Sequence, residues 1–133
     1  MKRPSKKEYY MNIARAISER SPCLKAKIGS IIVKNDAIIS CGYNGPARGE
    51  PHCKVCVRMD KESGSEYTIC PAIHSEENCI INAARQGTST IGGTLYLYGP
   101  NGGPPCYRCN RALKNAGIKE VIYGKEKYKT LKL

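Results

Sequence analysis

The sequence contains no phenylalanine or tryptophan and only two histidines among its 133 residues. The core must therefore be built from aliphatic side chains and from some of the nine tyrosines. No stretch of the chain approaches the roughly 18 consecutive apolar residues of a membrane-spanning helix, so we expect no membrane association. A chain of this length nevertheless buries a sizeable core, and we expect a single domain over residues 1–133.

Acidic residues are scarce. Asp and Glu number 11 against 22 Lys and Arg, which gives a formal net charge of +11. Such a charge suits an anionic partner, either a nucleotide phosphate or a nucleic acid. Much of the excess lies in two terminal segments, Lys2–Lys7 and Lys125–Lys132, where few aromatic residues are interleaved. Because base stacking needs such aromatics, we interpret these segments as solubilising rather than nucleic-acid-binding.

The pattern of a secretory signal is also missing, because the basic segment Met1–Lys7 is not followed by an apolar run. We therefore expect a cytoplasmic protein. The eight cysteines include C-x-x-C pairs, and in a reducing compartment this arrangement favours metal binding over disulfides.

One histidine and two cysteines have the spacing of a catalytic zinc site. His74 precedes Glu76 by two residues, and a later Pro-Cys-x-x-Cys run supplies Cys106 and Cys109. Three protein ligands leave the fourth position of a tetrahedral zinc ion open for water, whereas structural sites use four protein ligands. Because a carboxylate beside that water can move its protons, we predict Glu76 as the catalytic acid–base. The predicted zinc ligands are His74, Cys106 and Cys109.

Both halves of this motif are predicted to begin helices. Pro105 suits a first helical turn, where its missing N–H needs no partner, and Cys106 and Cys109 then share one face. The run after His74 has helical spacing and ends at Gly87, a typical C-cap residue. The alternative is a closed, purely structural zinc site, but such a site has no use for a carboxylate at position 76.

The rest of the chain alternates between helical and strand patterns. An amphipathic first helix is expected to end near Ser21, and two β-rich runs meet at Asn35–Asp36, a typical hairpin turn. After the hairpin the order is helix, strand, helix, strand, and the tail 127–133 is a candidate for a further strand. The expected elements are a first helix capped at Ser5, strands 28–34 and 37–41, helix 75–86, strand 94–98, helix 106–115 and strand 120–123.

A His-x-Glu run followed by Pro-Cys-x-x-Cys is the general signature of zinc-dependent nucleobase deaminases. Two further segments, 23–30 and Gly42-Tyr43-Asn44-Gly45, are similar to segments of deoxycytidylate (dCMP) deaminases. Between Tyr9 and Gly124 the chain thus resembles the cytidine/deoxycytidylate deaminase superfamily, and the dCMP deaminase group most closely. The resemblance implies an α/β fold, a three-layer α/β/α sandwich around a five-stranded mixed sheet.

The resemblance also implies roles for three substrate-binding residues. Asn44 would hydrogen-bond the sugar, the backbone around Ser75 would read the cytosine edge, and Lys25 would lie near the phosphate. Ser75 stands where alanine is commoner, and Lys25 stands where the family has arginine, which changes the geometry of phosphate binding. The loop Gly99–Pro105 is longer than the usual family form, which leaves the identity of the substrate open.

A second cysteine cluster lies in and beside a polar insert, residues 42–71. The resemblance implies that Cys23 and Cys53 ligate a second, structural zinc ion. Cys56 forms a C-x-x-C pair with Cys53, and with Cys70 it would complete a closed four-cysteine site. His52 could replace any one of these ligands, and the alternative is that some of the thiols are free. A metal here would stabilise an insert that has few apolar residues of its own.

Taken with the motif, the resemblance implies hydrolytic deamination of a cytosine nucleotide, with dCMP converted to dUMP and ammonia as the leading reaction. It further implies a homo-oligomer, often a hexamer, that responds to dCTP and dTTP. A nucleic-acid deaminase of the tRNA type is the first alternative, since the basic charge permits it, although Gly42–Gly45 favours the nucleotide enzymes. A non-catalytic zinc-binding module is the second, and Glu76 argues against it.

Overall fold

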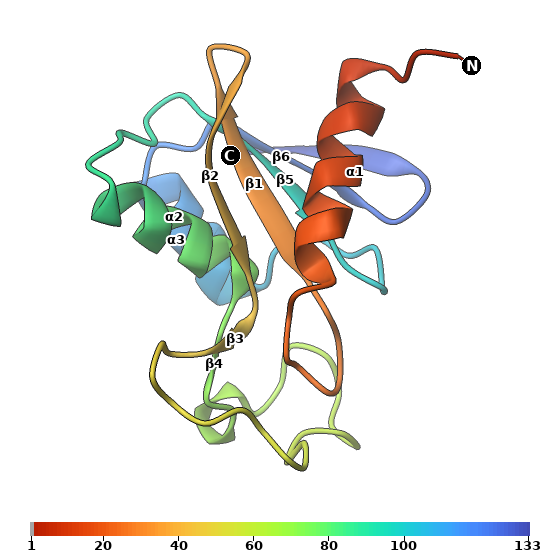
Figure 1. Cartoon of the computed structure of the whole chain (residues 1–133), viewed down its shortest axis with the longest axis vertical. Helices are drawn as coiled ribbons and strands as arrows, with labels where there is room; N and C mark the ends of the chain where they lie inside the picture. Colours follow the sequence, from red (N-terminus) through yellow and green to blue (C-terminus); the bar gives the residue numbers. More distant parts are fainter. Residues whose placement is uncertain (1) are drawn as a thin grey trace.

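The computed structural model describes residues 2–133 and places five strands in one mixed sheet (Figure 1). The strand order is β2-β1-β5-β6-β7, and only β5 and β6 pair in parallel. This confirms the predicted five-stranded mixed sheet, with the tail supplying the fifth strand. The strands are β1 (Gly29–Lys34), β2 (Ala37–Tyr43), β5 (Thr94–Tyr98), β6 (Glu120–Gly124) and β7 (Tyr128–Lys132).

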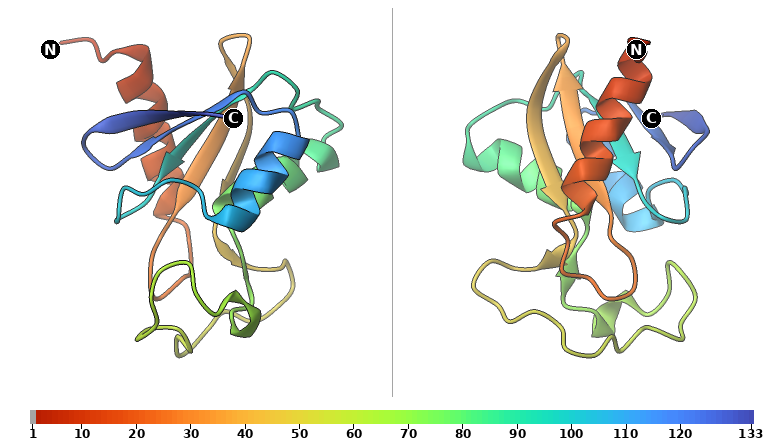
Figure 2. Two further views of the ribbon diagram at one scale, coloured as in Figure 1. Left: turned by 180° about the vertical axis from the view of Figure 1, so that it is seen from behind. Right: turned by 45° about the vertical axis from the view of Figure 1, so that its right-hand side comes forward.

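Helices cover both faces of this sheet, as the three-layer prediction requires. Helix α1 (Lys6–Ser18) lies on one face, and α2 (Ser75–Arg85) and α3 (Tyr107–Asn115) lie together on the other (Figures 1 and 2). Each face has its own core: Tyr10 and Met11 of α1 pack with β1, β5 and β6, whereas Cys79 of α2 and Leu113 of α3 pack on the opposite side. None of the helices within residues 2–133 has the length and apolarity needed to cross a membrane.

Local sequence explains the hairpin and the first helix. Asn35 and Asp36 both adopt positive φ angles, 52° and 58°, as a two-residue hairpin turn of this kind requires. Ser5 caps α1 by accepting a hydrogen bond from the backbone N–H of Glu8 at 3.2 Å. The hydroxyl of Tyr10 donates to Asp36 Oδ1 at 2.8 Å, which ties the helix to the tip of the hairpin.

Helix α2 is fixed against the edge strand β2, and this contact positions the start of the helix. The side-chain amides of Asn78 and Asn82 donate to the carbonyl oxygens of Tyr43 and Cys41, at 2.8 and 2.7 Å. Gly42 lies between Cys41 and Tyr43 on β2, and a Cβ atom at this position would meet the backbone of α2 at 2.7 Å. The absence of a side chain at Gly42 therefore lets the helix lie close to the strand.

The insert lies beyond one end of the sheet, below β1 and β2 in Figure 1. It contains only short elements, η1 (Tyr67–Ile69) and the bridge between β3 (Gly45–Pro46) and β4 (Ala72–Ile73). None of the described residues from 46 to 74 is buried. The insert is therefore held by hydrogen bonds and by what its cysteines bind, and not by a hydrophobic core of its own.

Candidate metal centre and active site

The structure brings the three predicted zinc ligands together. Within residues 2–133 they form the one group of three such ligands whose donor atoms all lie within 4.8 Å of one another. His74 Nδ1 is 3.5 Å from Cys106 Sγ and 3.3 Å from Cys109 Sγ. Tetrahedral zinc with ordinary Zn–N and Zn–S bonds separates a nitrogen and a sulfur ligand by about 3.6 Å, so the observed spacing fits the ion.

Two helix starts create this convergence. His74 is the N-cap of α2 and Cys106 is the N-cap of α3, so α3 begins one residue later than predicted. Cys106 Sγ accepts from the backbone N–H of Cys109 at 3.5 Å, because a cap side chain turns back over the first turn. The positive ends of two helix dipoles thus point at one place and favour thiolates there.

The contact between the two thiols shifts their pKa values in opposite directions. The contact with Cys109, helped by the nearby imidazole of His74, lowers the pKa of Cys106 to about 3. The same contact and burial raise the pKa of Cys109. Deprotonation of Cys106 is therefore favoured at this site, and a bound ion would displace any remaining proton.

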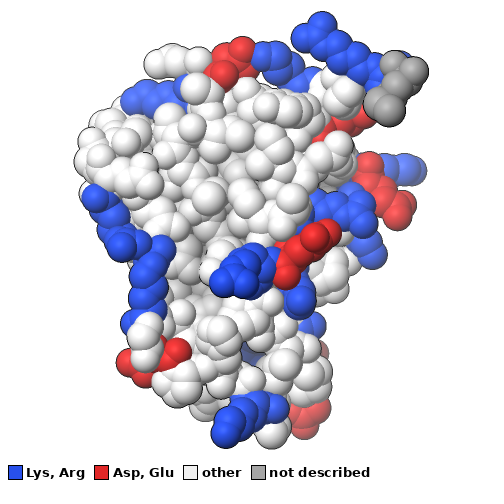
Figure 3. Space-filling model, in the orientation of Figure 1, with Lys and Arg blue, Asp and Glu red and all other residues white. Residues whose placement is uncertain are grey.

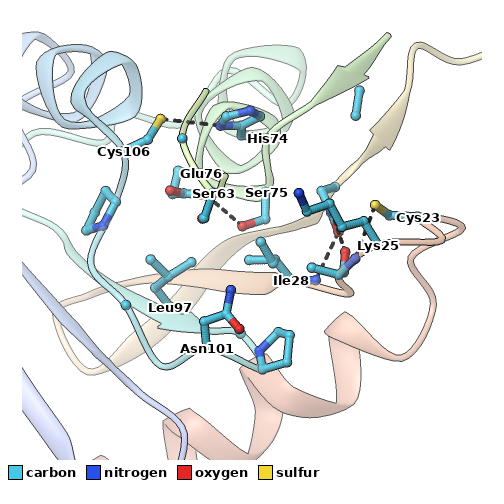
Figure 4. A pocket seen from close by; sticks show the side chains of 18 of the residues that line it. Cys23, Lys25, Ile28, Ser63, His74, Ser75, Glu76, Leu97, Asn101 and Cys106 are labelled. Carbon is cyan, nitrogen blue, oxygen red and sulfur yellow. Dashed lines mark hydrogen bonds between the residues drawn. The ribbon is translucent and has the colours of Figure 1, made fainter. Parts of the chain in front are cut away.

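Glu76 is buried beside the ligands, with 5% of its surface exposed. Ser75, which is fully buried, donates from Oγ to Glu76 Oε1 at 2.8 Å (Figure 4). Burial raises the pKa of Glu76, and hydrogen bonds from its own amide and from Ser75 oppose part of that rise. A buried carboxyl whose pKa is raised suits a group that must accept a proton and return it.

A cavity of about 370 Å³ opens above these residues. Figure 4 shows His74 and Cys106 facing each other, with Glu76 beside them and Lys25 on the opposite side of the cavity from Cys106. Ile28 and Leu97 supply apolar walls, and the whole Gly99–Pro105 loop forms another wall. The volume is typical of a small-molecule site.

Asn44 lines the cavity, but most of its amide is engaged by the protein. Its Oδ1 accepts from Ser21 Oγ at 2.6 Å and from the backbone N–H of Ile28 at 2.9 Å, and its Nδ2 donates to the carbonyl of Ala26 at 2.8 Å. One hydrogen on Nδ2 is left for a ligand. Asn44 therefore fixes the segment before β1 in addition to any contact with substrate.

Lys25 also lines the cavity, and its ammonium group holds the insert. Nζ donates to the carbonyl oxygens of Arg58 and Lys61, at 2.7 and 2.5 Å. Only one of the three donors of this ammonium group therefore remains for a phosphate.

Two residues of the insert reach the site without having been predicted. The ring of Tyr67 packs edge-on against His74, with centroids 4.6 Å apart, and the guanidinium of Arg58 lies 4.9 Å from the Tyr67 centroid. Arg58 also donates from Nε to the carbonyl of Ser65 at 2.8 Å. Because the insert has no periodic pattern, no signal in the sequence marked these residues.

The four cysteines of the second cluster also gather at one place. A small cavity of about 30 Å³, next to the first, is lined by all four of them, by apolar, glycine and proline residues and by Arg58, but not by His52. Their sulfur atoms are more widely spread than those of the first site, since within residues 2–133 no three of them lie within 4.8 Å of one another. The four residues are Cys23, Cys53, Cys56 and Cys70.

Comparisons with known proteins agree with this geometry. A family model described as the cytidine and deoxycytidylate deaminase zinc-binding region matches residues 4–125. The chain is 36% identical to the deoxycytidylate deaminase of Mycobacterium phage D29, over 95% of this chain and 99% of the phage protein. It is 35% identical to the deoxycytidylate deaminase of Schizosaccharomyces pombe, but it spans only 37% of that protein.

Among solved structures, the dCMP deaminase of cyanophage S-TIM5 in complex with dCMP and dUMP is similar to this chain. The TM-score is 0.73 at 28% sequence identity, over 91% of this chain and 82% of the cyanophage chain.

Proposed function

Because the chain belongs to the cytidine and deoxycytidylate deaminase family, we propose that it converts dCMP and water to dUMP and ammonia. The single observation that carries this proposal is the buried carboxylate of Glu76 beside three converging zinc ligands, at one end of a cavity of about 370 Å³. The names of the phage and yeast relatives, and the nucleotides bound by the cyanophage enzyme, support dCMP as the substrate.

A zinc ion held by His74, Cys106 and Cys109 would lower the pKa of water from about 16 toward 7 at the open fourth position. Glu76 performs the proton transfers. One of its oxygens, Oε1, is occupied by Ser75, so Oε2 takes a proton from the water that attacks C4. Glu76 returns that proton to ring nitrogen N3. It then takes the second proton from the hydroxyl group now on C4 and delivers it to the departing amine. The C4–N bond breaks, ammonia leaves, and a carbonyl remains at C4.

The cavity supplies contacts for the rest of the nucleotide. The remaining Nδ2 hydrogen of Asn44 suits a sugar hydroxyl, and the backbone at Ser75 suits the polar edge of cytosine. Lys25 and Arg58 are the two Lys or Arg side chains at the cavity wall, and we assign them to the phosphate. Since both also hold the insert, substrate binding and the shape of the insert are coupled.

An ammonia-release screen with zinc-loaded protein tests this function. Cytosine, cytidine, deoxycytidine, CMP, dCMP and dCTP are compared, and dCMP is expected to have the highest kcat/KM. In Glu76→Gln the loss of acid–base catalysis should lower kcat by at least about 10²-fold with zinc content unchanged. Equal turnover by Glu76→Gln, or no ammonia from any cytosine compound, would contradict the proposal.

We also propose a second, structural zinc ion on Cys23, Cys53, Cys56 and Cys70. Their convergence on one cavity supports it, and so does the lack of buried residues in the segment that they would hold. Metal analysis should give two zinc ions per chain, falling to one in the Cys53→Ser/Cys56→Ser double variant. One ion per chain in both proteins would reject the second site.

The family resemblance alone supports the remaining expectations, which we keep as proposals. They are a cytoplasmic location, assembly into a homo-oligomer such as a hexamer, and regulation by dCTP and dTTP. Sedimentation of the zinc-loaded protein, with and without these two nucleotides, tests the assembly and the response together.

A further inference from the structure

A single carboxylate oxygen joins the two halves of the metal site. Oε1 of Glu77 accepts a hydrogen bond from the backbone N–H of His74 at 3.0 Å. The same oxygen accepts from Nη2 of Arg108 at 3.1 Å. Glu77 lies in the first turn of α2, and Arg108 stands between Cys106 and Cys109 in the first turn of α3. The bridge therefore spans the two helix starts that carry the ligands.

The insert supports the same bridge from a second side. The guanidinium of Arg108 lies 5.3 Å from the centroid of the Tyr67 ring. That ring packs edge-on against the imidazole of His74. Arg108 thus contacts one residue that holds the His74 backbone and another that packs on its side chain.

We propose that Glu77 and Arg108 are positioning residues that hold His74 at ligand distance from Cys106 and Cys109 and so raise the affinity for zinc. This inference rests on the zinc site of the proposed function. Ligands that are already at the right separation lose less conformational freedom when the ion binds. Partners in the outer shell of metal sites typically change metal affinity by about 10- to 100-fold.

An alternative is that this ion pair serves only to stabilise the fold. Arg108 and Glu77 have side-chain exposures of 40% and 25%, and ion pairs near the surface contribute little to folding. The two explanations therefore differ in what they change: the positioning role changes zinc affinity, whereas the structural role changes the thermal stability of the metal-free protein. The pair between Lys132 and Glu120, at 2.8 Å on strands β7 and β6, provides a matched control away from the site.

The test is the zinc dissociation constant, measured by competition with a chelator, for the wild type, Glu77→Gln, Arg108→Met and the double variant. Cys106→Ser identifies the binding step that belongs to this site. Each single substitution is expected to weaken zinc binding by about 10- to 100-fold, and the double variant should be no weaker than the worse single variant. Lys132→Met should bind within about twofold of the wild type, because its ion pair touches no ligand.

Thermal unfolding of the metal-free variants completes the test. An unchanged midpoint with weakened zinc binding supports positioning, and Arg108→Lys, which keeps the charge, should recover part of the affinity. Unchanged zinc affinity in Glu77→Gln and Arg108→Met would overturn the inference. So would a loss of stability that accounts for the whole loss of affinity. Because no substrate is involved, this outcome is independent of dCMP turnover. If zinc binding depends on Glu77 and Arg108 but the protein releases no ammonia, the proposed function is rejected and the inference stands.

Discussion

At the scale of single residues, the serine at position 75 acts directly on the catalytic carboxylate. Its hydroxyl donates to Glu76 Oε1 in a fully buried setting, where an alanine would leave that oxygen without this donor. A hydrogen bond to a charged group contributes about 1.5–3 kcal/mol. Ser75 therefore restricts the orientation of Glu76 and favours its ionised form.

Replacing Ser75 by alanine should lower kcat by about tenfold with KM within about twofold, because a freer carboxylate is less often aligned for proton transfer. The substitution also removes a contact that lowers the pKa of Glu76, so this pKa should rise. Glu76 must be ionised to accept a proton. The acid limb of the pH–rate profile should therefore lie at a higher pH in the variant than in the wild type. Initial rates between pH 5 and 9 measure both effects; an unchanged kcat and acid limb would contradict them.

The ligands at this scale were predictable because their spacing alone specifies the chemistry. His-x-Glu and Pro-Cys-x-x-Cys each place their side chains within one helix start, so little tertiary information is needed. Tyr67 and Arg58 could not be found in this way, because they reach His74 only through the folding of the insert. The double use of Lys25, whose ammonium holds two carbonyl groups of the insert, likewise depends on long-range contacts.

At the scale of elements, the position of α2 depends on how closely it approaches β2. Asn78 and Asn82 fix the helix to the edge strand, and Gly42 leaves room for the contact. Since His74 precedes the first residue of α2, a shift of this helix moves a predicted zinc ligand.

Gly42→Ala should destabilise the protein by about 1–3 kcal/mol, because the added Cβ would lie 2.7 Å from backbone atoms of Ser75 and Cys79. Zinc binding should weaken with it, as the helix is pushed away from β2. Gly103→Ala is the control, since a Cβ at that position meets nothing within 4 Å. Urea unfolding of the two variants measures the difference, and equal stability would show that α2 does not depend on this close approach.

Elements with a strong local pattern were predicted within a few residues. The hairpin turn, α2, β5 and β6 follow from turn residues and periodicity, although β2 continues to Tyr43, two residues beyond the prediction, and α1 ends at Ser18, before the predicted Ser21. The two-residue bridge between β3 and β4 and the short η1 helix were missed. Elements this short leave no periodic signal, because contacts elsewhere in the chain determine them.

At the scale of the whole molecule, the arrangement of the charges bears on the kind of anion that binds. On the face drawn in Figure 3, Lys and Arg side chains form separate clusters, with acidic groups among them and uncharged surface between them. The two cations at the wall of the active-site cavity, Lys25 and Arg58, donate to carbonyl groups of the insert. This arrangement suits a single phosphate at the cavity better than a nucleic-acid backbone, which requires an extended cationic track.

Transfer RNA should therefore be a poor competitor of dCMP. At 150 mM salt, about 1 μM tRNA is expected to change the rate of dCMP deamination by less than about twofold, because non-specific nucleic-acid binding is weak at that ionic strength. The same assay at several salt concentrations provides the control. Strong inhibition that falls steeply with added salt would favour a nucleic-acid deaminase over a nucleotide enzyme.

Anomalous diffraction at the zinc edge, from crystals of the zinc-loaded protein grown with dUMP, tests the central claim most directly. The account predicts a zinc peak about 2.0–2.3 Å from His74 Nδ1, Cys106 Sγ and Cys109 Sγ, with no fourth protein ligand. The carboxylate of Glu76 should lie beside the open position, with the pyrimidine ring in the cavity. A zinc ion closed by four protein ligands, or a Glu76 side chain turned away from it, would contradict the account.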